Sequence, residues 1–173
     1  MTEKIQIKAR YLSDIDFSPY GQVLDYDSSE EKVYPDPDVI VTPGVGKLEI
    51  VKGNLDLIHL RVIRREFIGT ILERHVLTSQ TFIPLIGCSG LFLLAPPEDL
   101  ENENALPDLK KVIAVIFDGT KGVNIKRGTW HSSPFAISKV SDYIMISRAG
   151  TLNDDLRLID LPKQTDRYFE IVL

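Results

Sequence analysis

Cysteine is almost absent from the 173-residue sequence: Cys88 stands alone, so no internal disulfide can form. A lone thiol is typical of reducing compartments, and the first residues lack the long apolar core of a secretory signal. No stretch approaches the roughly 18 consecutive apolar residues that a membrane-spanning helix needs. We therefore expect a cytoplasmic protein with no membrane partner.

A shortage of positive charge excludes another class of function. Lysine and arginine number 20 against 25 aspartates and glutamates, which gives a net charge of −5 at pH 7. Nucleic-acid binding rests mainly on Lys and Arg neutralising phosphates, so no nucleic-acid partner is expected. Apolar residues make up 43% of the chain, and a chain of this length buries roughly 70% of its surface on folding. We expect a single domain over residues 1–173.

Helical patterns are also scarce. Short apolar or alternating segments, separated by Gly, Pro and Asp, predict strands instead. These segments are residues 5–9, 22–26, 55–64, 69–76, 81–86, 90–95, 111–117, 122–125, 136–137 and 143–147. Many short strands at this spacing predict an all-β sandwich or closed barrel, whose interior can hold one ligand. Residues 27–46 predict a long loop that either lies over a site as a lid or has no such role.

Two stretches carry residues suited to chemistry. Glu73 and His75 are two residues apart, so in a strand they face the same side, and Gln80 follows shortly. The second stretch is Gly128-Thr129-Trp130-His131. Histidine titrates near neutral pH and suits proton transfer, while imidazole and carboxylate also bind divalent metals.

These spacings resemble the two motifs of the cupin superfamily. Glu73, His75 and Gln80 fall on the three ligand positions of the first motif, and His131 falls on the fourth. The resemblance implies an all-β, cupin-type double-stranded β-barrel, or jelly roll, with few short helices. Glu and Gln replace the usual His and Glu at two of the four positions, and Gln is a poorer ligand. Two readings therefore stay open: one divalent ion held by His75, Gln80, His131 and Glu73, or no cofactor.

The residue types within and around these motifs resemble those of the ureidoglycolate lyase family, whose members are also called ureidoglycolate hydrolases. The resemblance runs from about residue 5 to about residue 160 and is carried by Glu73-Arg74-His75, Thr81-Phe82-Ile83-Pro84, Gly122-Val123-Asn124, Arg127, Trp130-His131 and Ser147-Arg148-Ala149-Gly150. The sequence departs from the family in having Ser132 where a second His is common. It also has Ile125-Lys126 where a Tyr-His pair is frequent.

Members of this family split ureidoglycolate into glyoxylate and urea during allantoin breakdown. The resemblance implies an amidine-type carbon–nitrogen lyase, a small carboxylate as substrate, and a homodimer. A base must take the hydroxyl proton and an acid must help urea leave, and arginine grips a carboxylate with two hydrogen bonds. The candidate catalytic residues are His75, His131 and Glu73, and the candidate substrate-binding residues are Arg127, Arg61, Trp130 and Tyr143.

Two other functions stay open because the departures lie close to the predicted site. One is another cupin enzyme, an isomerase, epimerase or oxygenase acting on a small acid or sugar. The other is a non-catalytic barrel that binds a small ligand, since one fold hosts many functions.

Overall fold

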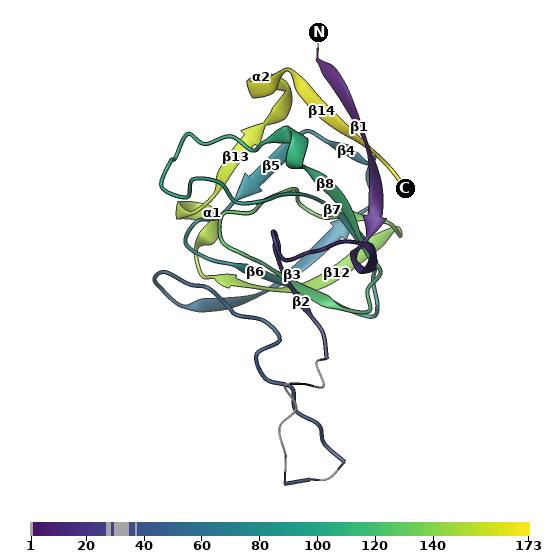
Figure 1. Cartoon of the computed structure of the whole chain (residues 1–173), viewed down its shortest axis with the longest axis vertical. Coiled ribbons are helices and arrows are strands. Elements are labelled where there is room, and N and C mark those ends of the chain that lie inside the picture. Colours follow the sequence, from purple (N-terminus) through teal and green to yellow (C-terminus); the bar gives the residue numbers. More distant parts are fainter. Residues whose placement is uncertain (1, 27–28, 30–34, 37) are drawn as a thin grey trace.

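The computed structural model describes residues 2–26, 29, 35–36 and 38–173, whose strands form two sheets around a common interior (Figure 1). The larger sheet has the order β13-β5-β10-β7-β8-β1-β14-β4, and β11 also pairs with β7. Its strands are β13 (Arg157–Asp160), β5 (Ile71–Arg74), β10 (Trp130–His131), β7 (Gly90–Ala95), β8 (Ile113–Phe117), β1 (Glu3–Tyr11), β14 (Arg167–Val172), β4 (Ile68–Gly69) and β11 (Phe135–Ala136).

The smaller sheet has the order β2-β9-β6-β12-β3. Its strands are β2 (Gly21–Leu24), β9 (Gly122–Ile125), β6 (Gln80–Pro84), β12 (Val140–Arg148) and β3 (Leu55–Ile63). The long strand β12 pairs with β3 on one side and with β6 on the other, so it fixes the register of this sheet. The sheet leaves β3 at one edge.

Apolar side chains from both sheets fill the interior. Strand alternation turns Phe82 and Met145 inward from the smaller sheet, and Phe92 and Val115 inward from the larger one. The Phe82 and Phe92 rings pack nearly at right angles with centroids 5.2 Å apart. This packing joins the two sheets into one barrel-like body.

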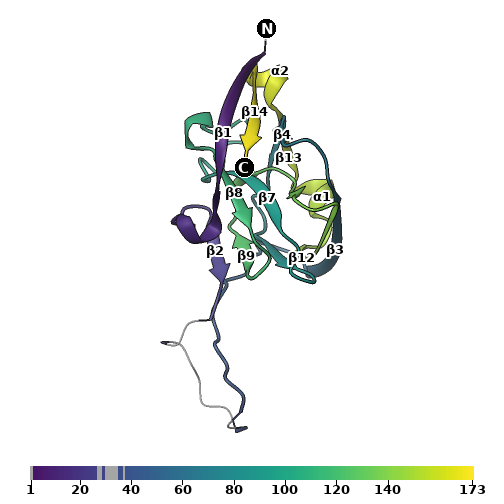
Figure 2. The ribbon, with the colours of Figure 1, turned by 90° about the vertical axis from the view of Figure 1, so that its right-hand side faces the viewer.

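A second apolar core covers the outer face of the larger sheet. Leu91 and Leu93 of β7 alternate with Phe92 and therefore face outward, where Ile159 of β13 and Phe169 of β14 pack on them. Because β7 is buried on both faces, it reads in the sequence as an uninterrupted apolar run. Figure 2 shows β1 and β14, from opposite ends of the chain, side by side over this region, where they pair in parallel.

The all-β, cupin-like fold predicted from the sequence is confirmed. Helices are short, as expected: η1 (Leu12–Asp14), η3 (Leu109–Lys111), α1 (Thr151–Asp154) and α2 (Leu161–Thr165). Within the described ranges, no helix has the length and apolar content needed to cross a membrane. The sequence analysis missed β13, α2 and β14, which cover the outer core.

The predicted lid over residues 27–46 is described only in part. Residues 27, 28, 30–34 and 37 lie outside the described residues, so the lid stays a prediction. The chain that follows this loop lies against the barrel: the backbone N–H of Lys47 donates to the Gln22 side chain, and Ile50 bridges to Thr78. This contact places residues 47–50 near Gln80, at the start of β6.

Candidate active site

Strand pairing brings Glu73 and His131 together. The two residues lie directly opposite each other in the β5–β10 pair. Their neighbours Leu72 and Trp130 belong to the outer core, so Glu73 and His131 face the barrel interior. The Nε2 atom of His131 lies 3.5 Å from the Oε1 atom of Glu73. Two strands far apart in the sequence thus place a carboxylate and an imidazole on one inner wall.

His75 completes this cluster. It follows β5 on the same face as Glu73, and its ring centroid lies 5.5 Å from that of His131. One ligand atom from each of Glu73, His75 and His131 lies within 4.8 Å of the others. The structure therefore brings together the three residues that the sequence analysis named as catalytic candidates.

Backbone carbonyls orient both imidazole rings. The Nδ1 atom of His75 lies 2.7 Å from the carbonyl oxygen of Asp155, and that of His131 lies 3.0 Å from the carbonyl oxygen of Thr129. A carbonyl only accepts, so each Nδ1 carries the proton and each Nε2 offers a lone pair. Neither Nε2 has a hydrogen-bond partner among the described residues, although both rings are buried.

Burial disfavours the protonated form of both imidazole rings. Desolvation lowers the pKa of His75 to about 4, with the nearby His131 as a second cause, and lowers the pKa of His131 to about 4. Desolvation also raises the pKa of the Glu73 carboxyl group, an effect that His75 opposes. Two imidazole lone pairs and a carboxyl group thus meet in a small space, and a shared proton, a metal ion or a hydrogen-bond donor of a ligand would satisfy them.

The ligand atoms fit a divalent ion in number and chemistry. Ligand atoms about 2.1 Å from one tetrahedral ion are about 3.4 Å apart. The three ligand atoms here lie within 4.8 Å of one another, so the cluster would contract on binding an ion. Each imidazole already donates a hydrogen bond from its Nδ1–H group to a backbone carbonyl, which is the arrangement common around metal-bound histidines. Glu73, His75 and His131 are therefore the residues that would hold a metal.

Two further buried polar atoms without partners face inward at this end of the barrel. Gln80 precedes Phe82 by two residues on β6, and Ser147 follows Met145 by two residues on β12, so both share the inward face of their strands. The Oε1 atom of Gln80 and the Oγ atom of Ser147 have no hydrogen-bond partner in the described part of the chain. The β6–β12 pairing of Thr81 with Ile146 places the two residues as neighbours.

The sequence analysis did not predict Ser147 as a site residue, because a serine at the end of a strand belongs to no motif. The alternation of β12 was the available signal, since it puts Tyr143, Met145 and Ser147 on one face. A buried hydroxyl without a partner costs stability, and such atoms in a native fold often mark a ligand site.

Arg127 borders the cluster. Its Nε atom donates to the Val76 carbonyl at 2.7 Å, and the next residue, Gly128, donates its backbone N–H to the His75 carbonyl at 2.7 Å. No acceptor among the described residues takes the two terminal nitrogens of Arg127, which is half-buried. These nitrogens are available to a carboxylate.

The other three predicted substrate-binding residues lie elsewhere. Arg61 is on the outer face of β3, where its side chain is 63% exposed and its Nε donates to Asp142 at 2.8 Å. Trp130 is fully buried in the outer core, with the Arg74 guanidinium 4.8 Å from its ring centre. The geometry does not bring either residue to the cluster, because the neighbouring residues take the inward positions.

Tyr143 faces the interior at the opposite end of the barrel. Its hydroxyl lies against Gly90, where an added Cβ would be 2.0 Å away. Gly90 begins β7, whereas Leu94, near the other end of that strand, is the residue paired with His131. Burial is the main cause that raises the pKa of Tyr143. Tyr143 therefore packs within the inner core, away from the histidines.

The two departures from the family pattern remove nothing from the cluster. The Ser132 hydroxyl accepts a hydrogen bond from the backbone N–H of Leu93 at 3.0 Å, so it supports the pairing of β7. Ile125 packs in the inner core opposite Gln80, and the Lys126 ammonium donates to the Ser18 carbonyl. These residues differ from the family pattern in the side chains near the cluster, but the acid–base groups of the cluster itself are all present.

Comparison with known proteins identifies the family. A family model described as ureidoglycolate lyase matches residues 4–165. A ureidoglycolate lyase of Pseudomonas fluorescens strain SBW25 is 30% identical over 161 residues, covering 86% of this chain and 92% of its own. That of P. fluorescens strain Pf-5 is 31% identical over 166 residues, covering 88% and 95%, and one of Burkholderia mallei is 30% identical over 138 residues, covering 78% and 77%. The chain thus belongs to the ureidoglycolate lyase family.

Proposed function

We propose that this protein cleaves ureidoglycolate to glyoxylate and urea in the breakdown of allantoin. The observation that carries the proposal is the buried cluster of Glu73, His75 and His131, in which only acceptors face one another. The reaction moves one proton from the substrate hydroxyl to the nitrogen of the departing urea, while the C–N bond breaks and a C=O bond forms. A cluster that accepts one proton and releases another suits this chemistry.

The geometry suggests separate roles for the two histidines. Glu73 and His131 are 3.5 Å apart and share one proton, which the raised pKa of the Glu73 carboxyl group favours. The Nε2 atom of His75 then stays free to accept the hydroxyl proton. The Glu73–His131 pair donates its proton to the urea nitrogen as the C–N bond breaks. His75, whose ring centroid is 5.5 Å from that of His131, then returns the hydroxyl proton to the pair, which restores the starting state.

The remaining polar groups fit the rest of the substrate. Arg127 offers its terminal nitrogens to the substrate carboxylate, a charge-assisted and bidentate contact. Gln80 and Ser147 offer an unpartnered carbonyl oxygen and hydroxyl to the N–H and C=O groups of the ureido moiety. A divalent ion held by Glu73, His75 and His131 would polarise the substrate hydroxyl or carboxylate.

The proposal is tested by incubating the purified protein with racemic ureidoglycolate and following glyoxylate, with and without added divalent metal. Turnover well above that of a His131→Ala variant is expected. No turnover above that control under either condition would refute the lyase. Elemental analysis of the same preparation separates the alternative enzyme class, because an oxygenase would carry stoichiometric iron.

Replacing Ser147 with alanine should lower turnover by about tenfold without lowering stability, because the lost hydroxyl has no partner in the fold. Ser141 is the matched control: it lies on the same face of β12, but its hydroxyl donates to the Ser89 carbonyl at 2.7 Å. Ser141→Ala should instead cost about 1 kcal/mol of unfolding free energy and leave turnover unchanged. Steady-state kinetics and urea unfolding measure both quantities, and equal turnover in Ser147→Ala and wild type would exclude Ser147 from the site.

We also propose a cytoplasmic homodimer. The lone cysteine supports a reducing compartment. Edge strand β3 supports self-association, because Leu57 and Ile63 on its outward face are 71% and 70% exposed. Light scattering after gel filtration should give a dimer for the wild type and a monomer for Leu57→Glu; a monomeric wild type would contradict this proposal.

A further inference from the structure

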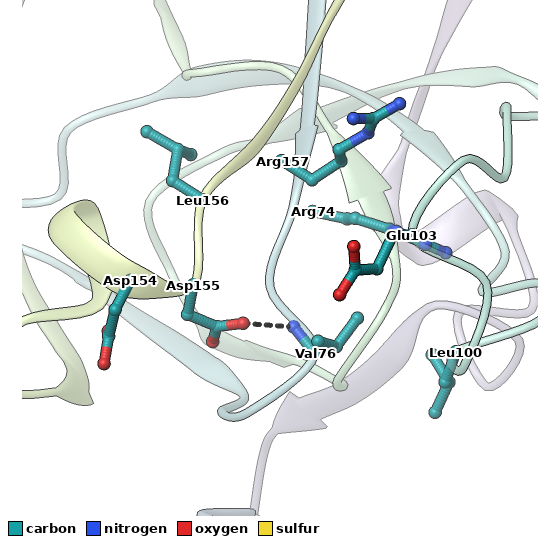
Figure 3. A pocket seen from close by; sticks show the side chains of 8 residues that line it. All are labelled: Arg74, Val76, Leu100, Glu103, Asp154, Asp155, Leu156 and Arg157. Atoms are coloured by element: carbon teal, nitrogen blue, oxygen red, sulfur yellow. Dashed lines mark hydrogen bonds between the residues drawn. The ribbon is translucent and has the colours of Figure 1, made fainter.

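A surface cavity of about 240 Å³ lies on the face of strand β5 that is opposite to the candidate active site (Figure 3). Arg74 and Val76 line it, and they alternate with Glu73 and His75, whose side chains face the barrel interior. The cavity also takes in Arg157, at the start of β13, and residues 154–156 before it. It is smaller than the 300–1,000 Å³ of typical drug-sized sites and suits a ligand of few atoms.

Two guanidinium groups meet at this cavity. Arg74 and Arg157 are directly opposite in the β5–β13 pair, so their side chains leave the sheet on the same face. Like charges in such a pair are destabilising unless a counter-charge lies between them. Arg74 is 2% exposed, and its terminal nitrogens donate only to uncharged backbone carbonyls of the loop at residues 98–102.

Neither guanidinium is neutralised by the protein. The Nε atoms of Arg74 and Arg157 are buried without a hydrogen-bond partner, and across the described ranges no carboxylate forms an ion pair with either residue. Burial lowers the pKa of Arg74, and the charge of Arg157 lowers it further, by more than the charge of Asp99 raises it. The two guanidinium charges at the β5–β13 pair therefore have no ion-pair partner among the described residues.

The carboxylates around the cavity have other roles. Asp154 pairs with Arg148, and the Asp155 carboxylate accepts the backbone N–H groups of Val76 and Leu77. Glu103 is exposed and forms no ion pair with either arginine, and Figure 3 shows its carboxylate between the Arg74 side chain and Val76, where it would compete with a bound anion.

We propose that this cavity is a binding site for a small oxyanion, the carboxylate or phosphate group of a small molecule, held by Arg157 with Arg74 behind it. A guanidinium presents its N–H groups as a planar fork that matches two oxygens of either anion. The two terminal nitrogens of Arg157, for which no acceptor is found among the described residues, form that fork, and the bound charge relieves the repulsion between the two arginines. The site is independent of the proposed lyase chemistry, because it uses the opposite face of β5.

The test titrates oxalate and inorganic phosphate into the full chain, with sodium chloride at equal ionic strength as the reference. Arginine Nε–H signals in ¹H–¹⁵N spectra and calorimetry report binding. A saturable shift of the Arg157 signal is expected with at least one oxyanion, and Arg157→Gln should weaken binding about tenfold or more. Saturation by oxalate alone or by phosphate alone supports the site and identifies which anion it takes.

Two control variants make the result decisive. Glu103→Gln removes the competing carboxylate and should bind the oxyanion as tightly as wild type or more so. His131→Ala should bind it like wild type, so this result does not depend on whether the protein cleaves ureidoglycolate. A wild type that responds only as it does to chloride, or Arg157→Gln binding equal to wild type, would overturn the proposal.

Discussion

Glu73→Gln should abolish turnover and at the same time make the protein more stable. The variant keeps the size of the side chain but removes the carboxylate that holds and donates the proton. Loss of an acid–base group costs 10²- to 10⁴-fold in rate, so turnover should fall about a thousandfold. The measurement is the rate of glyoxylate release at saturating ureidoglycolate.

The stability gain has a separate physical cause. The Glu73 carboxylate and the Nε2 atom of His131 lie 3.5 Å apart, and both are acceptors whenever the shared proton is absent. The amide of glutamine donates an N–H to that nitrogen and carries no charge to desolvate, so the unfolding free energy should rise by about 1 kcal/mol in chelator-treated protein.

Glu66→Gln is the matched control, because Glu66 is exposed and makes no ion pair or hydrogen bond in the described structure. It should change neither turnover nor unfolding free energy, since exposed charges contribute little. A Glu73→Gln variant with wild-type turnover would remove Glu73 from the mechanism. A variant that is both inactive and strongly destabilised would show that Glu73 has a structural role instead.

The sequence alone was enough to predict that Glu73, His75 and His131 lie together at the candidate site. Period-two alternation put Glu73 and His75 on one face, and motif spacing paired them with His131. Both inferences depend only on local geometry, which the backbone of a strand determines. The buried strand β7 was predicted for the same reason, because a strand covered on both faces shows as a continuous apolar run.

The alternation of a strand does not show which of its two faces lines the barrel interior. The predictions of Arg61 and Trp130 as substrate-binding residues depended on that choice of face. Trp130 and His131 are adjacent, so only one can face inward, and the outer core formed by β13, α2 and β14 takes the tryptophan. Arg61 faces outward because Val62 packs in the inner core. These assignments depend on contacts with strands that are distant in the sequence, among them the C-terminal ones that the sequence analysis missed.

The position of a residue along the barrel axis could not be predicted from the sequence either. Tyr143 and Ser147 share the inward face of β12, yet Tyr143 lies against Gly90 at one end, and Ser147 neighbours Gln80 at the other. The register of β12 against β6 decides which residue of β12 lies beside Gln80. That register comes from the whole set of cross-strand contacts and not from a motif.

Asp155 has no motif of its own, yet its replacement by alanine should lower stability and turnover together. Its carboxylate accepts the backbone N–H groups of Val76 and Leu77, at 2.8 and 3.0 Å, and its backbone carbonyl orients the His75 ring at 2.7 Å. Asp155→Ala leaves both partly buried donors unpaired, which should cost about 2–3 kcal/mol of unfolding free energy. The chain around His75 then loses its anchor, and turnover should fall about tenfold or more.

Asp155→Asn separates anchoring from charge. The amide oxygen of asparagine still accepts from both N–H groups, so this variant should lose less than about 1 kcal/mol and keep most of its turnover. Urea unfolding and initial rates, both measured well below the melting temperature, compare the three proteins. If Asp155→Ala lost stability but kept wild-type turnover, the position of His75 would not depend on this anchor. Retained stability would instead show that water or nearby groups replace the carboxylate. The expected joint loss follows because one residue holds both the backbone after β5 and the His75 ring, which we propose as the base.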